Sequence, residues 1–180
     1  MIRIAMDTIS RSDLEQRYGR TREVYEAYLA EVSSKVLPLL QDSEIKFTVK
    51  QRMKSFDSFF SKVLRKAREL NGKAVRNGSV LITDLIGMRI VCPFLEDTLR
   101  VEDLIRQNFE VVERERKGED YSPREFGYES THVIVKLAGP VEIAGRTQDE
   151  ILCEIQIRTN LQDAWAEVEH ELMYKAEFTP

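Results

Sequence analysis

Two carboxylates, Asp84 and Glu154, each adjoin a short apolar run with the composition of a β-strand. A carboxylate in such surroundings loses hydration, and a divalent cation shared by two carboxylates would compensate that loss. If the two runs are adjacent strands, the pair could hold one Mg²⁺ together with water and substrate phosphates, an arrangement that suits nucleotide chemistry. The alternative is that Asp84 caps a turn and that Glu154 pairs with a neighbouring cation.

A basic segment over residues 46–76 supplies candidate phosphate ligands, since its only acids are Asp57 and Glu69. Arg52 and Lys54 are two residues apart and would point the same way from an extended segment. Lys62 lies one turn after Ser58 and one turn before Lys66 on a predicted helix. Guanidinium groups provide planar donors and lysines provide point charges, so this set could clamp nucleotide phosphates. A solvated basic helix face is the alternative interpretation.

A third candidate feature is Tyr128, which follows Gly127 at the end of a polar stretch. It could be a stacking platform for a purine base, and His132, four residues later, falls on the same side of an extended chain. An ordinary loop tyrosine and a hydrogen-bonded strand histidine are the alternative. The sequence has no Gly-x-Ser-x-Gly elbow, P-loop or plausible cysteine nucleophile, which argues against nucleophilic catalysis.

The elements that must position these residues alternate between helices and strands, which predicts an α+β fold with a mixed sheet. Apolar periodicity predicts helices over residues 10–40, 56–71, 96–107 and 161–174. Ser12 is expected to cap the first helix and Pro38 to end or kink it. Strands are expected over residues 45–50, 88–91, 109–112, 131–137 and 151–157, with a short strand over 141–143.

The chain has 180 residues, of which 42% are hydrophobic and 32% charged, and is expected to form one domain over residues 1–180. A helical part over 1–43 would precede a catalytic core over 44–180. The net charge of -4 argues against a surface devoted to nucleic acid. With no long apolar run and no secretory signal, we expect a cytoplasmic protein with no membrane association. Cys92 and Cys153 are expected to be buried thiols.

Taken together and in order, these motifs resemble the synthetase domain of the RelA/SpoT family, which makes the alarmone (p)ppGpp of the stringent response. The resemblance covers residues 46–175. The matching residues are Arg52-x-Lys54 with Ser58 and Lys62, Asp84-Leu85-Ile86-Gly87-Met88-Arg89, Gly127-Tyr128-x-Ser130-x-His132, Glu154-Ile155-Gln156-Ile157-Arg158-Thr159 and Trp165-Ala166-Glu167-x-Glu169-His170-Glu171-Leu172-x-Tyr174-Lys175.

The resemblance implies a nucleotidyltransferase-like fold, in which about five strands form a mixed sheet flanked by helices. It also implies a GTP pyrophosphokinase that transfers the β,γ-pyrophosphate of ATP to the 3′-hydroxyl of GDP or GTP. Asp84 and Glu154 would be catalytic and bind Mg²⁺, with Glu154 placed to help deprotonate the attacking hydroxyl. The implied ATP-binding residues are Arg52 and Arg89 around adenine, and Lys54, Ser58, Lys62 and Arg65 near the phosphates.

On the acceptor side, the resemblance implies that Tyr128 stacks on guanine. His132 would lie near the acceptor phosphates, with Ser130 beside it, and Gln156 near the acceptor nucleoside. Asp163 stands where some small synthetases carry asparagine, and its carboxylate could accept hydrogen bonds from the N1 and N2 donors of guanine.

The acceptor loop departs from the family pattern, with Glu119 in place of the usual lysine and Phe126 in place of the usual asparagine. Two alternatives therefore stay open: a toxin-type pyrophosphotransferase acting on the tRNA 3′ end or on adenine nucleotides, and a degenerate nucleotide-binding module without turnover. Stand-alone members usually continue with further helices that support oligomers. Since the chain ends at Pro180, an excised domain of a longer protein and a homo-oligomer are both compatible with the resemblance.

Overall fold

A five-stranded mixed sheet forms the centre of the molecule in the computed structural model, which describes residues 2–5, 10–71, 79–117, 130–137, 141–143, 146–148 and 151–177. The strand order is β2-β4-β9-β6-β5, in which β4 and β9 run parallel and every other neighbouring pair is antiparallel. The predicted fold class is therefore confirmed. The strands are β2 (Thr48–Met53), β4 (Ile86–Cys92), β9 (Cys153–Thr159), β6 (Ser130–Lys136) and β5 (Glu110–Lys117).

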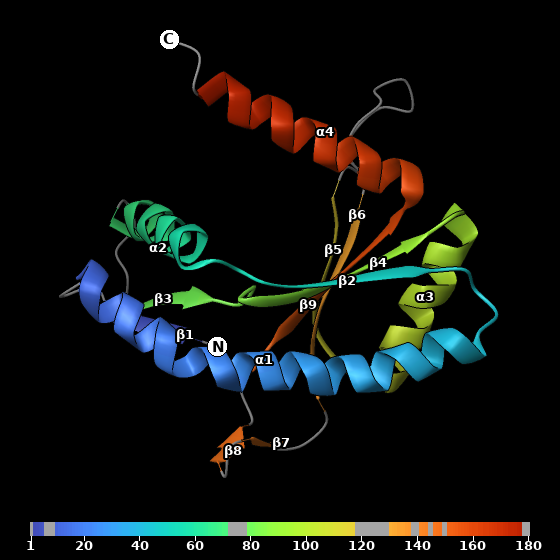
Figure 1. Ribbon diagram of the computed structural model, residues 1–180, viewed down its shortest axis with the longest axis horizontal. Coiled ribbons are helices and arrows are strands. Elements are labelled where there is room, and N and C mark those ends of the chain that lie inside the picture. The colour runs from blue at the N-terminus through green and yellow to red at the C-terminus, as the bar shows by residue number, and fades with distance from the viewer. Residues whose placement is uncertain are drawn as a thin grey trace.

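Four described helices surround this sheet: α1 (Arg11–Asp42), α2 (Phe56–Asn71), α3 (Leu95–Asn108) and α4 (Asn160–Glu177). In Figure 1 the long helix α1 runs along one side of the sheet and α4 lies on the opposite side. Two small antiparallel pairs complete the described chain, β1 (Ile2–Ala5) with β3 (Ser79–Ile82) and β7 (Val141–Ile143) with β8 (Arg146–Gln148).

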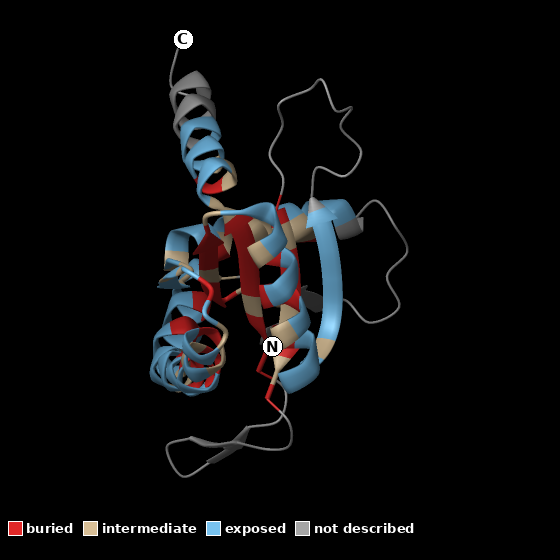
Figure 2. Cartoon of the chain, turned by 90° about the vertical axis from the view of Figure 1, so that its right-hand side faces the viewer, coloured by how far each residue is buried: buried red, intermediate tan, exposed pale blue. Residues whose placement is uncertain are grey.

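One face of the sheet is apolar because alternate residues of each strand point to the same side. Met88, Ile90 and Ile155 on this face are almost completely buried, and α1 and α3 pack against the strands that carry them. Val36 of α1 and Ile105 of α3 are fully buried in the same cluster. Burying an aliphatic side chain of this kind contributes about 1.5–3 kcal/mol. Figure 2 shows the buried residues concentrated in the central strands and in the helix surfaces that meet them.

The opposite face carries the polar residues of the same strands, and the strand register arranges them in rows. Residues directly opposite each other on neighbouring strands share a face of the sheet. One row therefore contains Lys50, Arg89, Gln156 and His132, and the next contains Arg52, Gly87 and Glu154. Residues that are distant in sequence thus form one polar surface.

The described elements correct several expectations. Strand β2 begins at Thr48 and continues to Met53, so the strand expected over 45–50 is shifted along the chain. Helix α1 continues through Pro38 to Asp42, because the fully buried Val36 and Leu40 hold this turn against the core. Its N-cap position is occupied by Ser10, with no side-chain capping bond, and the predicted Ser12 cap is wrong.

The sequence pattern does not indicate strands β1, β3 and β8. Each has at most four residues, which is too few to show a clear alternation of apolar and polar residues. The short strand over 141–143 is confirmed as β7. Among the described helices, none is both long and apolar enough to cross a bilayer.

Candidate active site

Asp84 lies between two lysines at the point where the chain enters β4. Lys54 Nζ and Lys62 Nζ each donate to Asp84 Oδ2 at 2.5 Å. Pairing of β2 with β4 extends past the strand ends, since the Lys54 N–H donates to the carbonyl oxygen of Leu85 at 2.8 Å. That contact places Lys54 beside Asp84, and Lys62 reaches the same carboxylate from α2. The side-chain contacts of Asp84 in the described structure are thus with these two lysines.

The charges of this cluster hold Asp84 ionised. Burial alone would raise the pKa of Asp84, but hydrogen bonds and charges from Lys54 and Lys62 outweigh it and lower the pKa to about 2. Burial also lowers the pKa of Lys54, and its contact with Asp84 offsets that effect only in part. Asp84 Oδ1 is buried and has no hydrogen-bond partner among the described residues. A buried carboxylate oxygen in this state can still bind a partner from outside the described residues.

Glu154 lies on the adjacent strand, held by one donor on each oxygen. His132 Nδ1 is 2.9 Å from Glu154 Oε1, and Gln156 Nε2 donates to Oε2 at 2.9 Å. Burial raises the pKa of Glu154, but the hydrogen bond and charge of His132, followed by the Gln156 hydrogen bond, lower it overall. Asp84 is close enough to act in the opposite direction and raise this pKa. The structure therefore brings together the two carboxylates that the sequence selected.

Gly87 permits this close approach of β4 and β9. It lies opposite Glu154 in the parallel register, and a Cβ atom at this position would be 3.2 Å from the Glu154 backbone oxygen. Such a distance is tighter than an ordinary van der Waals contact. Glycine therefore allows β4 to pass Glu154 without displacing it.

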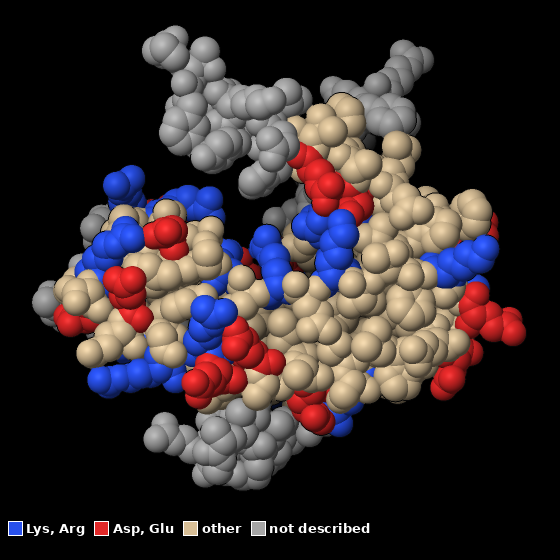
Figure 3. All heavy atoms as spheres, in the orientation of Figure 1, with Lys and Arg blue, Asp and Glu red and all other residues tan. Residues whose placement is uncertain are grey.

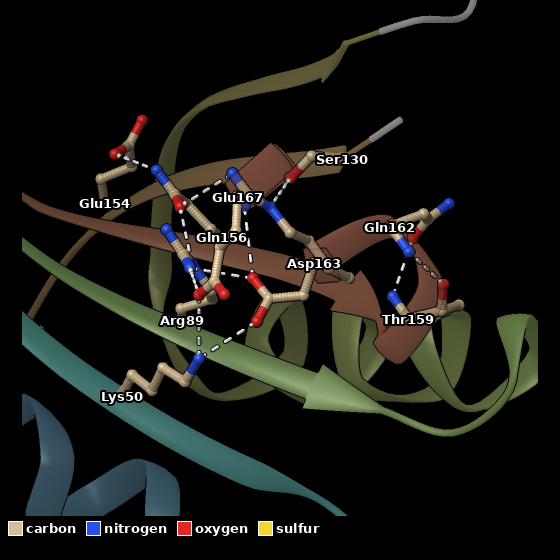
Figure 4. A network of polar contacts seen from close by, with 10 residues as sticks. Lys50, Arg89, Ser130, Glu154, Gln156, Thr159, Gln162, Asp163 and Glu167 are labelled. Carbon is tan, nitrogen blue, oxygen red and sulfur yellow. Dashed lines mark hydrogen bonds and ion pairs between the residues drawn. The ribbon is translucent and has the colours of Figure 1, made fainter. Parts of the chain in front are cut away.

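A network of ions and amides continues from Glu154 toward α4 (Figure 4). Arg89 Nη1 is 2.8 Å from Asp163 Oδ1, and Lys50 Nζ is 3.3 Å from Asp163 Oδ2. Lys50 also reaches Glu167 Oε1 at 3.2 Å. Asp163 is only 7% exposed, whereas the side chains of Lys50 and Glu167 are largely exposed, so the network runs from the interior to the surface. The carboxylate thus fastens the first turns of α4 to β2 and β4.

A pocket of about 240 Å³ opens beside this network. Figure 3 shows lysine and arginine side chains gathered around a hollow between α2 and α4. Arg52 is exposed and Arg89 partly buried, so both guanidinium groups can offer donors or stacking surfaces to a ligand. The pocket is lined by Lys50, Gln51, Arg52, Gly87, Met88, Arg89 and Gln156.

The other predicted residues are more scattered. Ser58 and Arg65 are exposed on α2, and the Ser58 N–H donates to Ser55 Oγ at 3.3 Å in the first turn. Ser130 is buried at the start of β6, where its hydroxyl oxygen accepts from Arg158 Nε at 3.0 Å. Tyr128 lies outside the described residues, as do Glu119 and Phe126 of the altered loop.

Sequence reasoning did not select Lys50, Arg158 or Tyr18 as site residues. Lys50 and Arg158 continue the polar alternation of β2 and β9, a signal that could have identified them. Tyr18 carries no such signal. Its hydroxyl on α1 donates to the carbonyl oxygen of Lys54 at 2.5 Å, a contact between residues far apart in sequence.

Fold and site together define an α+β domain with paired carboxylates beside a cationic pocket, and comparison with known proteins gives its family. Residues 51–179 match the family model described as the region found in RelA / SpoT proteins, and the chain belongs to this family. It is 37% identical over 128 residues to GTP pyrophosphokinase YwaC of Bacillus subtilis (strain 168), a match that covers 70% of this chain and 57% of that protein.

A second relative, GTP pyrophosphokinase YjbM of the same organism, is 34% identical over 137 residues, which cover 74% of this chain and 58% of that protein. The chain thus spans little more than half the length of these relatives. Among solved structures, small alarmone synthetase 1 from Bacillus subtilis matches with a TM-score of 0.71 and 27% identity, over 91% of this chain and 82% of that one. The same protein bound to its product pppGpp matches with a TM-score of 0.69 and 27% identity, over 92% and 84%.

Proposed function

We propose that this protein is a GTP pyrophosphokinase, which transfers the β,γ-pyrophosphate of ATP to the 3′-hydroxyl of GDP or GTP. One observation carries the proposal: Asp84, two residues before β4, and Glu154, on the neighbouring parallel strand β9, lie beside Lys54, Lys62 and an arginine-lined pocket. The names of the matched relatives and the pppGpp-bound neighbour support the same reaction.

The two carboxylates fit a divalent cation, which we propose to be Mg²⁺. The buried Asp84 Oδ1 has no partner in the described part of the chain, and carboxylate oxygens are the ligands that hard cations prefer. The described residues contain no larger cluster of metal-binding side chains, so Mg²⁺ would complete its coordination with water and substrate phosphates. When bound, it would neutralise phosphate charge as the pyrophosphate is transferred.

On the donor side, Arg52 and Arg89 would stack on the two faces of adenine, since both line the pocket. Lys54, Lys62 and Arg65 would bind the phosphates, with Ser58 at the start of α2. Two lysines around one aspartate leave a local excess of one positive charge, which attracts an anionic ligand. Positioning and electrostatic stabilisation of this kind require no covalent intermediate with the protein.

On the acceptor side, Glu154 would accept the proton of the 3′-hydroxyl while the hydroxyl oxygen bonds to the β-phosphorus of ATP. The bond from that phosphorus to the oxygen shared with the α-phosphate breaks, and AMP leaves. His132 and Ser130 would lie toward the acceptor phosphates, Gln156 toward the nucleoside and Tyr128 on the guanine. Asp163 already binds Arg89, Lys50 and Arg158, so its contact with guanine N1 and N2 requires an exchange of partners.

The test is to incubate the purified chain with Mg²⁺ and ATP labelled in its β- and γ-phosphates, with GDP, GTP, GMP, ATP or tRNA as acceptor. We expect AMP release and label on GDP or GTP, abolished by Glu154→Gln and by EDTA. Glu96→Gln, at an exposed position in the first turn of α3, is the matched control and should keep wild-type activity.

Absence of AMP with every guanine nucleotide would overturn this function. Label on tRNA or on adenine nucleotides alone would establish the toxin-type reaction, and tight nucleotide binding by calorimetry without turnover would establish a binding module. We also propose a cytoplasmic homo-oligomer, which fractionation of cells and analytical ultracentrifugation would test.

A further inference from the structure

Arg158 is a buried cation for which the proposed reaction has no role. It lies on β9 with only 4% of its surface exposed, between Gln156 and the start of α4. Burying a guanidinium group is unfavourable unless its donors are satisfied. Arg158 Nε donates to Ser130 Oγ at 3.0 Å and Nη2 donates to Gln156 Oε1 at 3.1 Å, while Nη1 lies 3.4 Å from Asp163 Oδ1. A residue so deeply enclosed acts through its neighbours and not on a substrate.

The contact with Gln156 fixes the direction of its amide group. Arg89 Nε also approaches Gln156 Oε1, at 3.4 Å, so two guanidinium groups face the same oxygen. Guanidinium nitrogens only donate hydrogen bonds, and the amide oxygen must therefore face them. The amide nitrogen is then turned toward Glu154, where Nε2 donates to Oε2 at 2.9 Å. If the amide were reversed, its nitrogen would face the guanidinium donors of Arg158 and Arg89, and its oxygen would face the carboxylate of Glu154.

Glu154 is held on both sides as a result. Gln156 fixes Oε2, and His132 contacts Oε1 from β6 at 2.9 Å. We propose that Arg158 is a positioning residue for Glu154 and that it acts through the amide of Gln156. This inference rests on the proposed function, in which Glu154 is the group that receives the proton of the acceptor hydroxyl.

A purely structural role, fastening α4 to the sheet, is less consistent with the contacts. The Arg158–Asp163 contact is the longest of the three, at 3.4 Å. Asp163 keeps Arg89 at 2.8 Å and Lys50 at 3.3 Å without it. Loss of Arg158 should therefore leave α4 attached and act mainly on the orientation of Gln156.

A double-mutant cycle separates the two roles. Arg158→Met removes the donors but keeps a long side chain, and Gln156→Leu removes the amide at similar volume. We expect Arg158→Met to lower kcat by about 10- to 100-fold, the cost of misplacing one catalytic group, with less than a threefold change in the KM for ATP. In the Gln156→Leu background the same substitution should lower kcat by less than about threefold, because the amide through which it acts is gone.

Arg158→Lys keeps the charge and a donor, and should recover part of the lost kcat. Arg106→Met, on the exposed surface of α3, is the control and should leave kcat and melting temperature unchanged. If Arg158→Met does not fold, the cycle is measured with Arg158→Lys. Equal losses of kcat in both backgrounds, or a lowered melting temperature with unchanged kcat, would overturn the inference. An inactive wild-type protein would instead contradict the proposed function.

Discussion

Replacing Asp84 by asparagine should destabilise the ligand-free protein more than replacing either lysine that it binds. The cluster contains one anion and two cations, and Asp84 Oδ2 accepts from both Lys54 and Lys62. Removing one lysine leaves a balanced ion pair. Removing the carboxylate leaves two ammonium groups facing each other with no anion between them, which is the more costly change.

The structure gives the size of the effect. The pKa of Asp84 is lowered from 3.8 to about 2, because its bonds to the two lysines outweigh the opposing effect of burial. One pKa unit corresponds to about 1.36 kcal/mol, so the ionised carboxylate contributes roughly 2 kcal/mol at neutral pH. The side chain of Asp84 is 12% exposed, so solvent screens this interaction only weakly. Lys62→Met removes one of two charge-assisted bonds and should cost about 1 kcal/mol.

Urea unfolding at neutral pH in EDTA measures these differences. Because the pKa of Asp84 is lower in the folded state, the stabilisation is complete above the unfolded value of 3.8 and is lost as the pH falls toward 2. The difference in the free energy of unfolding between wild type and Asp84→Asn should therefore decrease as the pH falls over this range. Asp57→Asn is the control, since its ion pair with Arg11 is exposed and should contribute little. An Asp84→Asn protein as stable as wild type, or a Lys62→Met protein less stable than Asp84→Asn, would refute the reasoning.

Three further outcomes follow from the described contacts. Tyr18→Phe, which removes the hydroxyl that binds the Lys54 carbonyl, should raise the KM for ATP by about threefold to tenfold in steady-state assays; an unchanged KM would contradict this role of α1. Gly87→Ala should lower the free energy of unfolding by about 1 kcal/mol in urea titrations and reduce kcat, because its Cβ would lie 3.2 Å from the Glu154 carbonyl oxygen on β9. An unchanged kcat would show that β9 can shift to accommodate the Cβ without disturbing the site. Cys92 and Cys153, whose thiol pKa values burial raises to about 11 and about 12, should not react with a thiol reagent at pH 8 until the protein is unfolded; rapid labelling of the folded protein would contradict their burial.

Local sequence patterns predicted much of the fold. The run from Cys153 to Arg158 alternates apolar and polar residues, and this period of two assigned one side of β9 to the core and the other to the site. Helices α2 and α3 were predicted to within a residue because their apolar stripes have a clear period. Helix α1, predicted over residues 10–40, runs to Asp42 and does not end at Pro38, since burial of the adjacent turns outweighs the local effect of proline.

The sequence by itself determined which residues were suited to the chemistry: two acids next to apolar strands, a basic segment, and motifs in the order of one family. Only the tertiary structure decided that Asp84 and Glu154 meet, because their meeting depends on the parallel register of β4 and β9. It also decided that Asp163 binds Arg89 and Lys50 and that Arg158 donates to the amide oxygen of Gln156. Local patterns specify the face on which a side chain lies, whereas long-range pairing specifies its neighbours, and the chemistry depends on those neighbours.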